Sequence, residues 1–217
     1  MKLTNLAAAL TLLITTACVQ HTVQKKPTVD PATGLQSVSA FGHRVVFPPA
    51  VWVKGSDDGA ESEYFSSGDS RFALWEQIPK GQSFDSWQQM YAVQIVPAEN
   101  GTAIASKLLL DTTSVFIGSC RPGGFESVRL SGSPTEGTFL FICENVSGLN
   151  RFGYRDGMGE VAIFRFVGTG TAAFKIYHEW RGPKFRFLDR DSWPVSREAV
   201  EEAKKLIGSV SFDIVHE

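Results

Sequence analysis

The sequence predicts an α+β domain, in which an antiparallel β-sheet of about six or seven strands carries two main helices. Residues 160–167 and 171–180 are strand candidates that flank Gly168-Thr169-Gly170, which indicates a β-hairpin. Two other stretches place apolar residues at spacings of three and four, as helices do. The aromatic content, 16 Phe and 5 Trp against 4 Tyr, favours a sheet-rich core.

The first half of the domain is expected to contain short strands and one helix. Residues 41–47, stopped by Pro48-Pro49, and residues 71–78 are strand candidates. Ser83 can cap a helix that stops before Pro97 and Asn100-Gly101. The apolar stripe of this helix would consist of Phe84, Trp87, Tyr91 and Ile95.

The middle of the chain is expected to be rich in strands. Residues 114–119, 125–130 and 138–143 are candidates, and the last of them is apolar on both faces, so it should be covered on both. In the second arm of the hairpin, successive side chains point to opposite faces. One face would hold Phe174, Ile176, His178 and Trp180, and the other Lys175, Tyr177 and Glu179.

The C-terminal part of the domain predicts a second helix and a closing strand. Ser196 is the expected N-cap, and Gly208 the expected end of the helix. Glutamates come early in this segment and lysines late, which suits the helix dipole. The apolar stripe would consist of Ala199, Val200, Ala203, Leu206 and Ile207, and residues 210–215 would form the strand.

The first 18 residues have the pattern expected of an export signal. Lys2 supplies a positive charge, and residues 6–14 form an apolar run shorter than the roughly 20 residues that span a bilayer. Thr15-Thr16-Ala17 then lead directly to Cys18. This stretch resembles the lipobox of bacterial lipoproteins, which implies that residues 1–17 are a signal peptide and that Cys18 carries lipid. The alternative is ordinary secretion with cleavage before Cys18, which would leave a free thiol.

The resemblance to lipoproteins implies a location in the cell envelope, with the domain lipid-anchored to a membrane and facing the periplasm. Val19 stands where the inner-membrane retention signal would place Asp, so the outer membrane is favoured over the inner one. Residues 18–36 are polar and contain Pro and Lys, which is typical of a flexible tether. Residues 37–217 would form a single globular domain.

Cys120 and Cys143 form an even pair in an exported chain, which favours a disulfide bond over two buried thiols. If the three strands expected around them formed a simple meander, the outer strands would lie about 9–10 Å apart. That separation exceeds the roughly 7 Å limit between bridged Cα atoms. Either Cys120 therefore bends over in the turn with Pro122-Gly123-Gly124, or the first and third strands are direct neighbours.

Charge and motifs exclude several functions. The net charge of −2 and a pI near 6.1 give no electrostatic attraction for nucleic acid, so no nucleic-acid partner is expected. The sequence lacks the zinc-protease, serine-hydrolase, Cys-x-x-Cys and phosphate-loop motifs, and no metal or cofactor is expected. His43 and His178 remain as acid–base candidates for an enzyme of another type. His178, among aromatic residues, is expected to be a semi-buried structural residue with satisfied hydrogen bonds.

The segment from Trp180 to Phe187 interleaves cations with aromatic residues beside a Gly-Pro bend. It is a candidate surface for a protein partner or for anionic lipid headgroups. The residues concerned are Arg181, Lys184, Phe185 and Arg186. The alternative is an ordinary strand end whose aromatic side chains face the core and whose cations face water.

Two short stretches resemble the PsbP-like family, which includes an extrinsic photosystem protein and several bacterial lipoproteins. They are Phe47-Pro48-Pro49-Ala50-Val51-Trp52 and Ile78-Pro79-Lys80-Gly81-Gln82-Ser83, the latter leading into Trp87 and Met90. With the late hairpin, helix and strand, the resemblance covers residues 41–215. It implies an accessory or assembly role beside a membrane complex, usually without catalysis, and it transfers no functional residue.

These observations favour a non-catalytic accessory or binding subunit of an envelope protein complex. The alternative is a module that binds a small apolar ligand or lipid, which predicts an apolar cavity between sheet and helix. A third hypothesis is an enzyme of unrecognised type that uses His43 or His178. The sequence does not indicate an oligomeric state.

Overall fold

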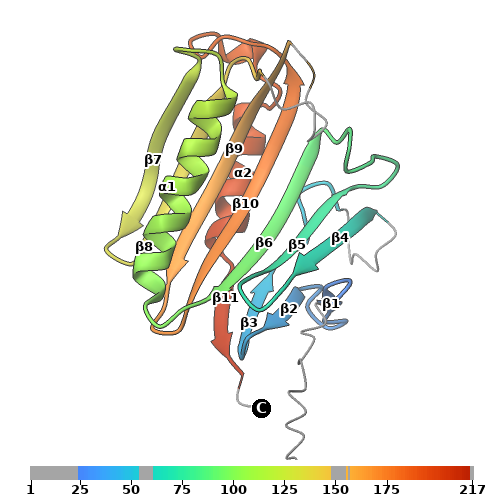
Figure 1. The fold of residues 1–217 in the computed structure, drawn as a ribbon. Coiled ribbons are helices and arrows are strands. Elements are labelled where there is room, and N and C mark those ends of the chain that lie inside the picture. Colours follow the sequence, from blue (N-terminus) through green and yellow to red (C-terminus); the bar gives the residue numbers. More distant parts are fainter. Residues whose placement is uncertain (1–23, 54–60, 148–154, 156, 216–217) are drawn as a thin grey trace, which may run out of the picture.

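The computed structural model describes residues 24–53, 61–147, 155 and 157–215. In this part of the chain there are two antiparallel sheets and two α-helices (Figure 1), which confirms the predicted α+β class. The larger sheet corresponds to the predicted one and has seven strands. The smaller, four-stranded sheet has no counterpart in the prediction.

The larger sheet has the strand order β4-β5-β6-β10-β9-β8-β7, and every neighbouring pair is antiparallel. The predicted hairpin is confirmed as β9 and β10, and β10 lies at the centre of the sheet between β6 and β9. The bounds of the strands are β4 Ser62–Gly68, β5 Ala73–Pro79, β6 Gln89–Pro97, β7 Phe125–Ser133, β8 Glu136–Cys143, β9 Met158–Gly168 and β10 Ala172–Pro183.

The smaller sheet has the order β1-β2-β3-β11 and includes part of the segment expected to be a tether. Its strands are β1 Thr28–Val29, β2 Gln36–Ala40, β3 His43–Phe47 and β11 Ser211–Ile214. β1 pairs with the first residues of β2. Trp75 Nε1 also donates a 2.6 Å hydrogen bond to the carbonyl oxygen of Gln24. Pairing with the sheet therefore orders part of the 18–36 segment.

Alternation along the strands gives the larger sheet two buried faces. One face, which includes Tyr91 and Ile176, packs against the smaller sheet and helix α2, Arg197–Gly208. The other face, which includes Phe164, packs against helix α1, Gly101–Ser119. In Figure 1 α1 lies in front of the sheet and α2 behind it. A side chain on β10 therefore faces α1 or α2 according to the parity of its number.

Helix α1 begins against the turn between β9 and β10. The Asn100 side chain accepts a 3.1 Å hydrogen bond from the backbone N–H of Ala103 and caps the helix. A Cβ atom on Gly101 would lie 1.9 Å from the carbonyl oxygen of Ala172, so the first turn reaches the sheet only with glycine here. The N-terminus of α1 is thus fixed by Asn100-Gly101, which the sequence pattern had suggested as the end of a helix.

The C-terminal helix and strand agree with the prediction. The Ser196 side chain accepts a 3.2 Å hydrogen bond from the backbone N–H of Ala199, as expected of the N-cap of α2. Val200, Ala203 and Ile207 are buried, and β11 follows the helix.

The helix predicted to start at Ser83 is wrong, because residues 89–97 form β6. Tyr91 and Ile95 face the α2 side of the sheet, and Met90 faces the α1 side. Both faces of β6 are buried, so its apolar residues show no alternation with polar ones and their spacing happens to fit a helix.

The strand predicted at residues 114–119 is also wrong, because this segment is the last part of α1. The helix exposes Leu110, Val115 and Ile117 as well as burying apolar residues, so its sequence has no amphipathic period. Its Thr, Val and Ile residues favour strands in isolation.

Cys120 follows α1 directly and is bonded to Cys143 at the end of β8. The Sγ–Sγ distance is 2.02 Å and the Cα–Cα distance is 5.7 Å. The bond ties the C-terminal end of α1 to the sheet.

Neither the length nor the apolar content of any helix in the described residues suffices for a membrane span.

Candidate functional site

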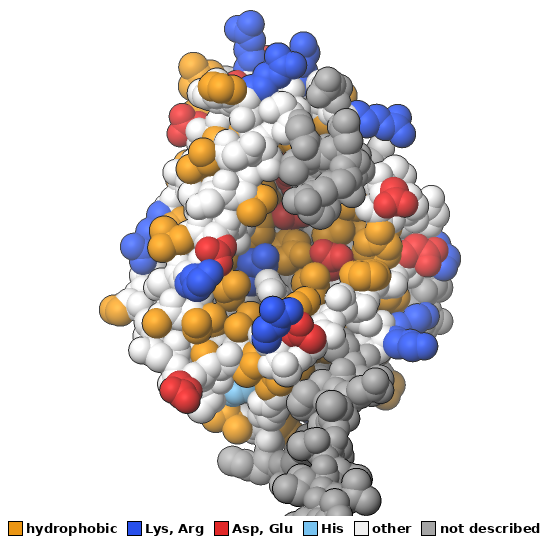
Figure 2. Space-filling view, in the orientation of Figure 1, with side chains coloured by type: hydrophobic (Ala, Val, Ile, Leu, Met, Phe, Trp, Pro, Cys, Tyr) orange, Lys and Arg blue, Asp and Glu red, His pale blue; other side chains and the backbone are white. Residues whose placement is uncertain are grey.

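A cleft of about 570 Å³ opens on the face of the larger sheet that carries α1. α1 forms one wall, and Phe84, Asp85 and Trp87 of the β5–β6 connection form the opposite wall. Figure 2 shows this face, where hydrophobic side chains surround a hollow that contains acidic and basic ones. The other lining residues are Phe65, Glu76, Met90, Gln94, Leu108, Asp111, Thr112, Val115, Phe116, Phe164, Lys175, Tyr177, Glu179 and Arg181.

The central strand β10 supplies most of the chemistry of the cleft. Lys175, Tyr177, Glu179 and Arg181 alternate with core residues and point to the α1 side of the sheet. Because α1 packs mainly on β9 and β10, the floor toward β5 is left without a helix above it. The predicted alternation of this hairpin arm is confirmed, and it brings Lys175, Tyr177 and Glu179 into one site.

Arg181 is paired with Glu160 of the neighbouring strand. Its Nε lies 4.0 Å from Glu160 Oε1, and the two side chains are only 6% and 5% exposed. The guanidinium carbon lies 3.4 Å from the centre of the Trp87 ring, a cation–π contact. Trp87 and Glu160 therefore hold Arg181 in place at one end of the cleft.

Glu76, Tyr177 and Lys175 form a second polar group on the floor. Tyr177 donates a 2.9 Å hydrogen bond from its hydroxyl to Glu76 Oε1. Lys175 Nζ lies 5.0 Å from the centre of the Tyr177 ring and 6.0 Å from that of Phe164. Burial lowers the pKa of Lys175 below its ordinary value, although Glu179 and Glu76 oppose this effect. Burial likewise raises the pKa of Glu76.

Glu179 is the acidic group of the floor with the fewest stabilising contacts. Burial raises the pKa of its carboxyl well above the ordinary 4.5, the nearby Glu160 raises it further, and Arg181 and Lys175 oppose them. Among the described residues, neither a hydrogen bond nor an ion pair engages this carboxylate. A half-buried carboxylate of this kind costs free energy in the empty site and is available to a ligand.

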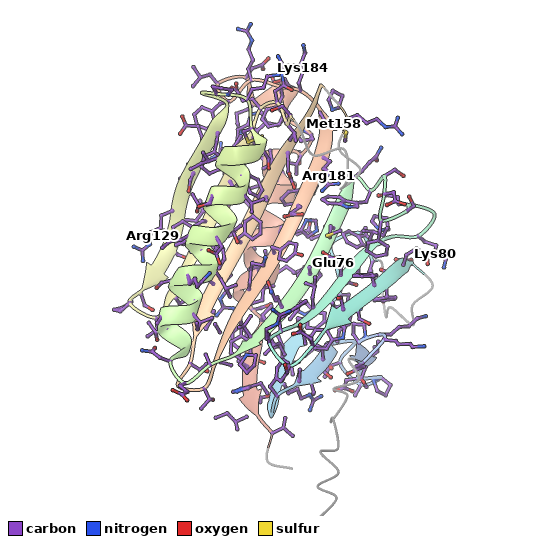
Figure 3. All side chains as sticks on the ribbon, in the orientation of Figure 1. Glu76, Lys80, Arg129, Met158, Arg181 and Lys184 are labelled. Carbon is purple, nitrogen blue, oxygen red and sulfur yellow. A yellow bond between two sulfur atoms is a disulfide. The ribbon has the colours of Figure 1, made fainter. Side chains whose placement is uncertain are left out.

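The structure does not bring the four residues of the predicted basic patch together on one surface. Arg181 lies in the cleft, whereas Lys184 lies beyond the end of β10, at one end of the molecule (Figure 3). Phe185 is 6% exposed and packs against Trp193 on the α2 side, and Arg186 is exposed. The physical reason is the end of the strand at Pro183, after which the chain turns and side chains no longer follow the alternation of β10.

The two histidine candidates lie away from the cleft. His178 is fully buried on the α2 side between Trp52, Tyr91 and Trp180, and burial lowers its pKa to about 3. Neither ring nitrogen of His178 has a hydrogen-bond partner among the described residues, so the expectation of a semi-buried, satisfied histidine is wrong. His43 is also buried, with its Nε2 3.2 Å from Thr171 Oγ1.

Sequence reasoning missed Glu76, Glu160 and Trp87 as parts of a site. The available signal was the row of ionisable residues at alternate positions of β10, a strand whose neighbours on both sides are apolar. Charges in such a strand must lie in a buried or half-buried place, and that place is a candidate site. Within the described ranges, no group of three or more His, Cys, Asp or Glu residues could hold a metal ion. Cys18 lies outside these ranges.

The comparisons with known proteins give limited similarity. No protein-family model matches the chain, and no curated protein matches it. A mutant of the protein Mog1 is similar over 83% of this chain and 96% of its own, with 11% identity and a TM-score of 0.44. The Ran-binding protein Mog1p of Saccharomyces cerevisiae is similar over 89% of this chain and 97% of its own, with 11% identity and a TM-score of 0.42. Similarity of this degree supports no argument about function.

Proposed function

We propose that this chain is an envelope lipoprotein whose domain is a non-catalytic binding module, and that the cleft beside α1 is its binding site. The observation that carries the proposal is the cleft itself: about 570 Å³, with aromatic walls and four ionisable side chains on its floor. Sites for small ligands have about 300–1,000 Å³, mainly apolar walls and a few convergent polar groups. The floor groups are Glu76, Lys175, Glu179 and Arg181.

The electrostatics of the cleft support a binding role over a purely structural one. Ionisable side chains on the central strand of a sheet lose hydration, and well-packed apolar residues at such positions are often as stable or more stable. Glu179 shows this cost directly, because burial raises its pKa and the described residues supply it with no hydrogen bond. Groups that destabilise the empty fold are typical of binding and catalytic sites.

The alternatives from the sequence fit the cleft less well. A site for a purely apolar ligand would have an uncharged floor, whereas this floor carries two cations and two carboxylates. An enzyme that used His43 or His178 would need one of them in the cleft, and both lie outside it. Attachment to the envelope is supported by residues 1–18, which resemble a lipoprotein signal.

The cleft can be tested with two cysteine variants of the full-length protein. Val115 and Ile117 both lie on α1 and are 58% and 59% exposed, but only Val115 lines the cleft. A native envelope extract that contains the ligand should slow alkylation of Val115→Cys several-fold and leave Ile117→Cys unchanged. Cys120 and Cys143 are bonded, so they do not react. The proposal is contradicted if no extract fraction changes the alkylation rate of Val115→Cys. It is also contradicted if a fraction slows alkylation of both variants equally.

A further inference from the structure

The floor of the cleft holds more negative than positive charge once its internal pairs are counted. Arg181 is engaged by Glu160 and by the Trp87 ring. Lys175 and Arg181 both lower the pKa values of Glu76 and Glu179, but Arg181 is shared with Glu160. Two cations, Lys175 and Arg181, therefore face the three carboxylates of Glu76, Glu160 and Glu179, and the pKa values of Glu76 and Glu179 are raised.

The rim adds to this imbalance. Asp85 and Asp111 line the cleft and are exposed at its edge. Lys107 pairs with Asp111 at 2.5 Å, but it does not line the cleft. With Asp111 paired to Lys107 and Arg181 to Glu160, the lining residues leave the acidic side chains of Glu76, Asp85 and Glu179 against the basic side chain of Lys175.

The walls are suited to an apolar chain that ends in a cation. Aromatic side chains line the cleft from the mouth to the floor, and the Phe65 and Phe84 rings lie 5.6 Å apart at the side away from α1. Leu108 and Val115 complete the apolar surface on α1. Aromatic faces attract cations as well as apolar groups, so such walls favour positively charged ligands over negatively charged ones.

We propose that the cleft binds a small amphiphilic amine, whose cationic group reaches Glu179 and whose apolar part lies against Phe84 and Leu108. This inference rests on the proposed function and names the chemical class of the ligand. An amine at Glu179 would give the carboxylate the charged hydrogen bond that the described residues do not provide.

An anionic ligand fits the same residues less well. It would approach Lys175 past Glu76 and Glu179, and past the two aspartates at the rim. It would also have to compete with Glu160 for Arg181, whose side chain is 6% exposed. Glu160 and the Trp87 ring thus hold Arg181, whereas the carboxylate of Glu179 accepts no hydrogen bond from the described residues.

Three probes of matched shape test the charge preference: 2-phenylethylamine, 2-phenylethanol and 3-phenylpropanoate. Their affinities follow from how far each slows alkylation of Val115→Cys in the full-length protein at pH 7. The amine should bind about tenfold or more tightly than the alcohol, because a hydrogen bond to a charged partner is stronger than a neutral one. The carboxylate should bind most weakly of the three.

Glu179→Gln in the Val115→Cys background should remove the preference, so that amine and alcohol bind within about threefold of each other. Glu202→Gln is the matched control, because Glu202 is exposed on α2 and distant from the cleft. It should leave the preference unchanged. Circular dichroism of each variant checks that the fold is retained.

The outcomes separate this inference from the proposed function. Tightest binding of 3-phenylpropanoate, or an amine preference that survives Glu179→Gln, would overturn the inference and leave the cleft as a binding site. Protection of Val115→Cys by an envelope extract but by no probe would likewise overturn the amine class alone. If neither extract nor probe protects it, both proposals fail.

Discussion

Glu179 and His178 are neighbours in β10, yet each is fully or largely removed from water on a different side of the sheet. His178 is surrounded by aromatic rings in the closed core, whereas Glu179 reaches the open cleft. Both residues lack hydrogen bonds to the described residues, so both lower the stability of the empty fold. Burial lowers the pKa of His178 and raises that of Glu179, so stability measurements at different pH values separate the effects of the two residues.

Replacing Glu179 by Gln should stabilise the ligand-free protein by on the order of 1 kcal/mol at pH 8. The folded-state pKa of Glu179 is raised above 4.5, so the folded protein holds a proton that the unfolded chain releases. Its contribution to stability is therefore lost as pH rises from about 4.5 through the folded pKa. Urea unfolding at several pH values should show a gap that favours the variant and widens with pH. A gap that is constant or that narrows would refute the buried-charge account of this residue.

Replacing His178 by Leu should have the opposite pH dependence. The pKa of His178 falls from 6.5 to about 3 on folding, so the unfolded chain gains a proton that the folded protein refuses. Between pH 6.5 and about 3, wild type should lose up to about 1.4 kcal/mol per pH unit relative to the variant. Near pH 7 the variant should be at least as stable as wild type. If the unfolding free energies of the two proteins fall in parallel as the pH is lowered, His178 gains its proton in the folded state, and the prediction is wrong.

At the scale of the elements, the disulfide bond between Cys120 and Cys143 fixes the end of the helix that walls the cleft. The double variant Cys120→Ala/Cys143→Ala should lose about 3 kcal/mol of unfolding free energy, because the bond closes a loop across a separation of 23 residues. Chemical denaturation measures this loss, and wild type under reducing conditions is the control. Equal stability of the oxidised wild type and the double variant would be evidence against a stabilising bond.

The elements that could be predicted from the sequence are those with a clear polarity pattern. The β9–β10 hairpin has Gly168-Thr169-Gly170 between two strand-forming arms, and α2 has a serine cap and a polar outer face, so each could be predicted. β6 and α1 could not, because β6 is buried on both faces and α1 exposes apolar residues as well as polar ones. In both elements, tertiary contacts decide between helix and strand.

The cleft could be predicted only in part, for the same reason. Alternation in β10 places Lys175, Tyr177 and Glu179 on one face, but the hollow above them depends on where α1 lies. Neither α1 nor the pairing of β6 with β10, which brings Glu76 near Tyr177, was predicted. The sequence therefore did not indicate an enclosed space. The cationic residues at 181–186 therefore predict a surface patch instead.

In the whole molecule, β1 and β11 lie toward one end and Lys184 lies at the other, with the cleft on the side (Figures 1 and 3). An anchor on Cys18 would hold the β1 end toward the membrane and leave the cleft facing sideways. The full-length protein should accordingly partition into the detergent phase of a cloud-point extraction, and Cys18→Ser should move to the aqueous phase. If wild type is aqueous as well, the chain has no lipid anchor.

Hydrogen–deuterium exchange can decide whether the ligand meets the cleft or the part of the predicted basic patch outside it, Lys184, Phe185 and Arg186. The full-length protein is compared with and without the envelope fraction that protects Val115→Cys. We expect slower exchange in peptides from α1 and from residues 84–88 at the two walls of the cleft, with residues 184–190 unchanged. Protection confined to residues 184–190, with the walls of the cleft exchanging as before, would contradict it.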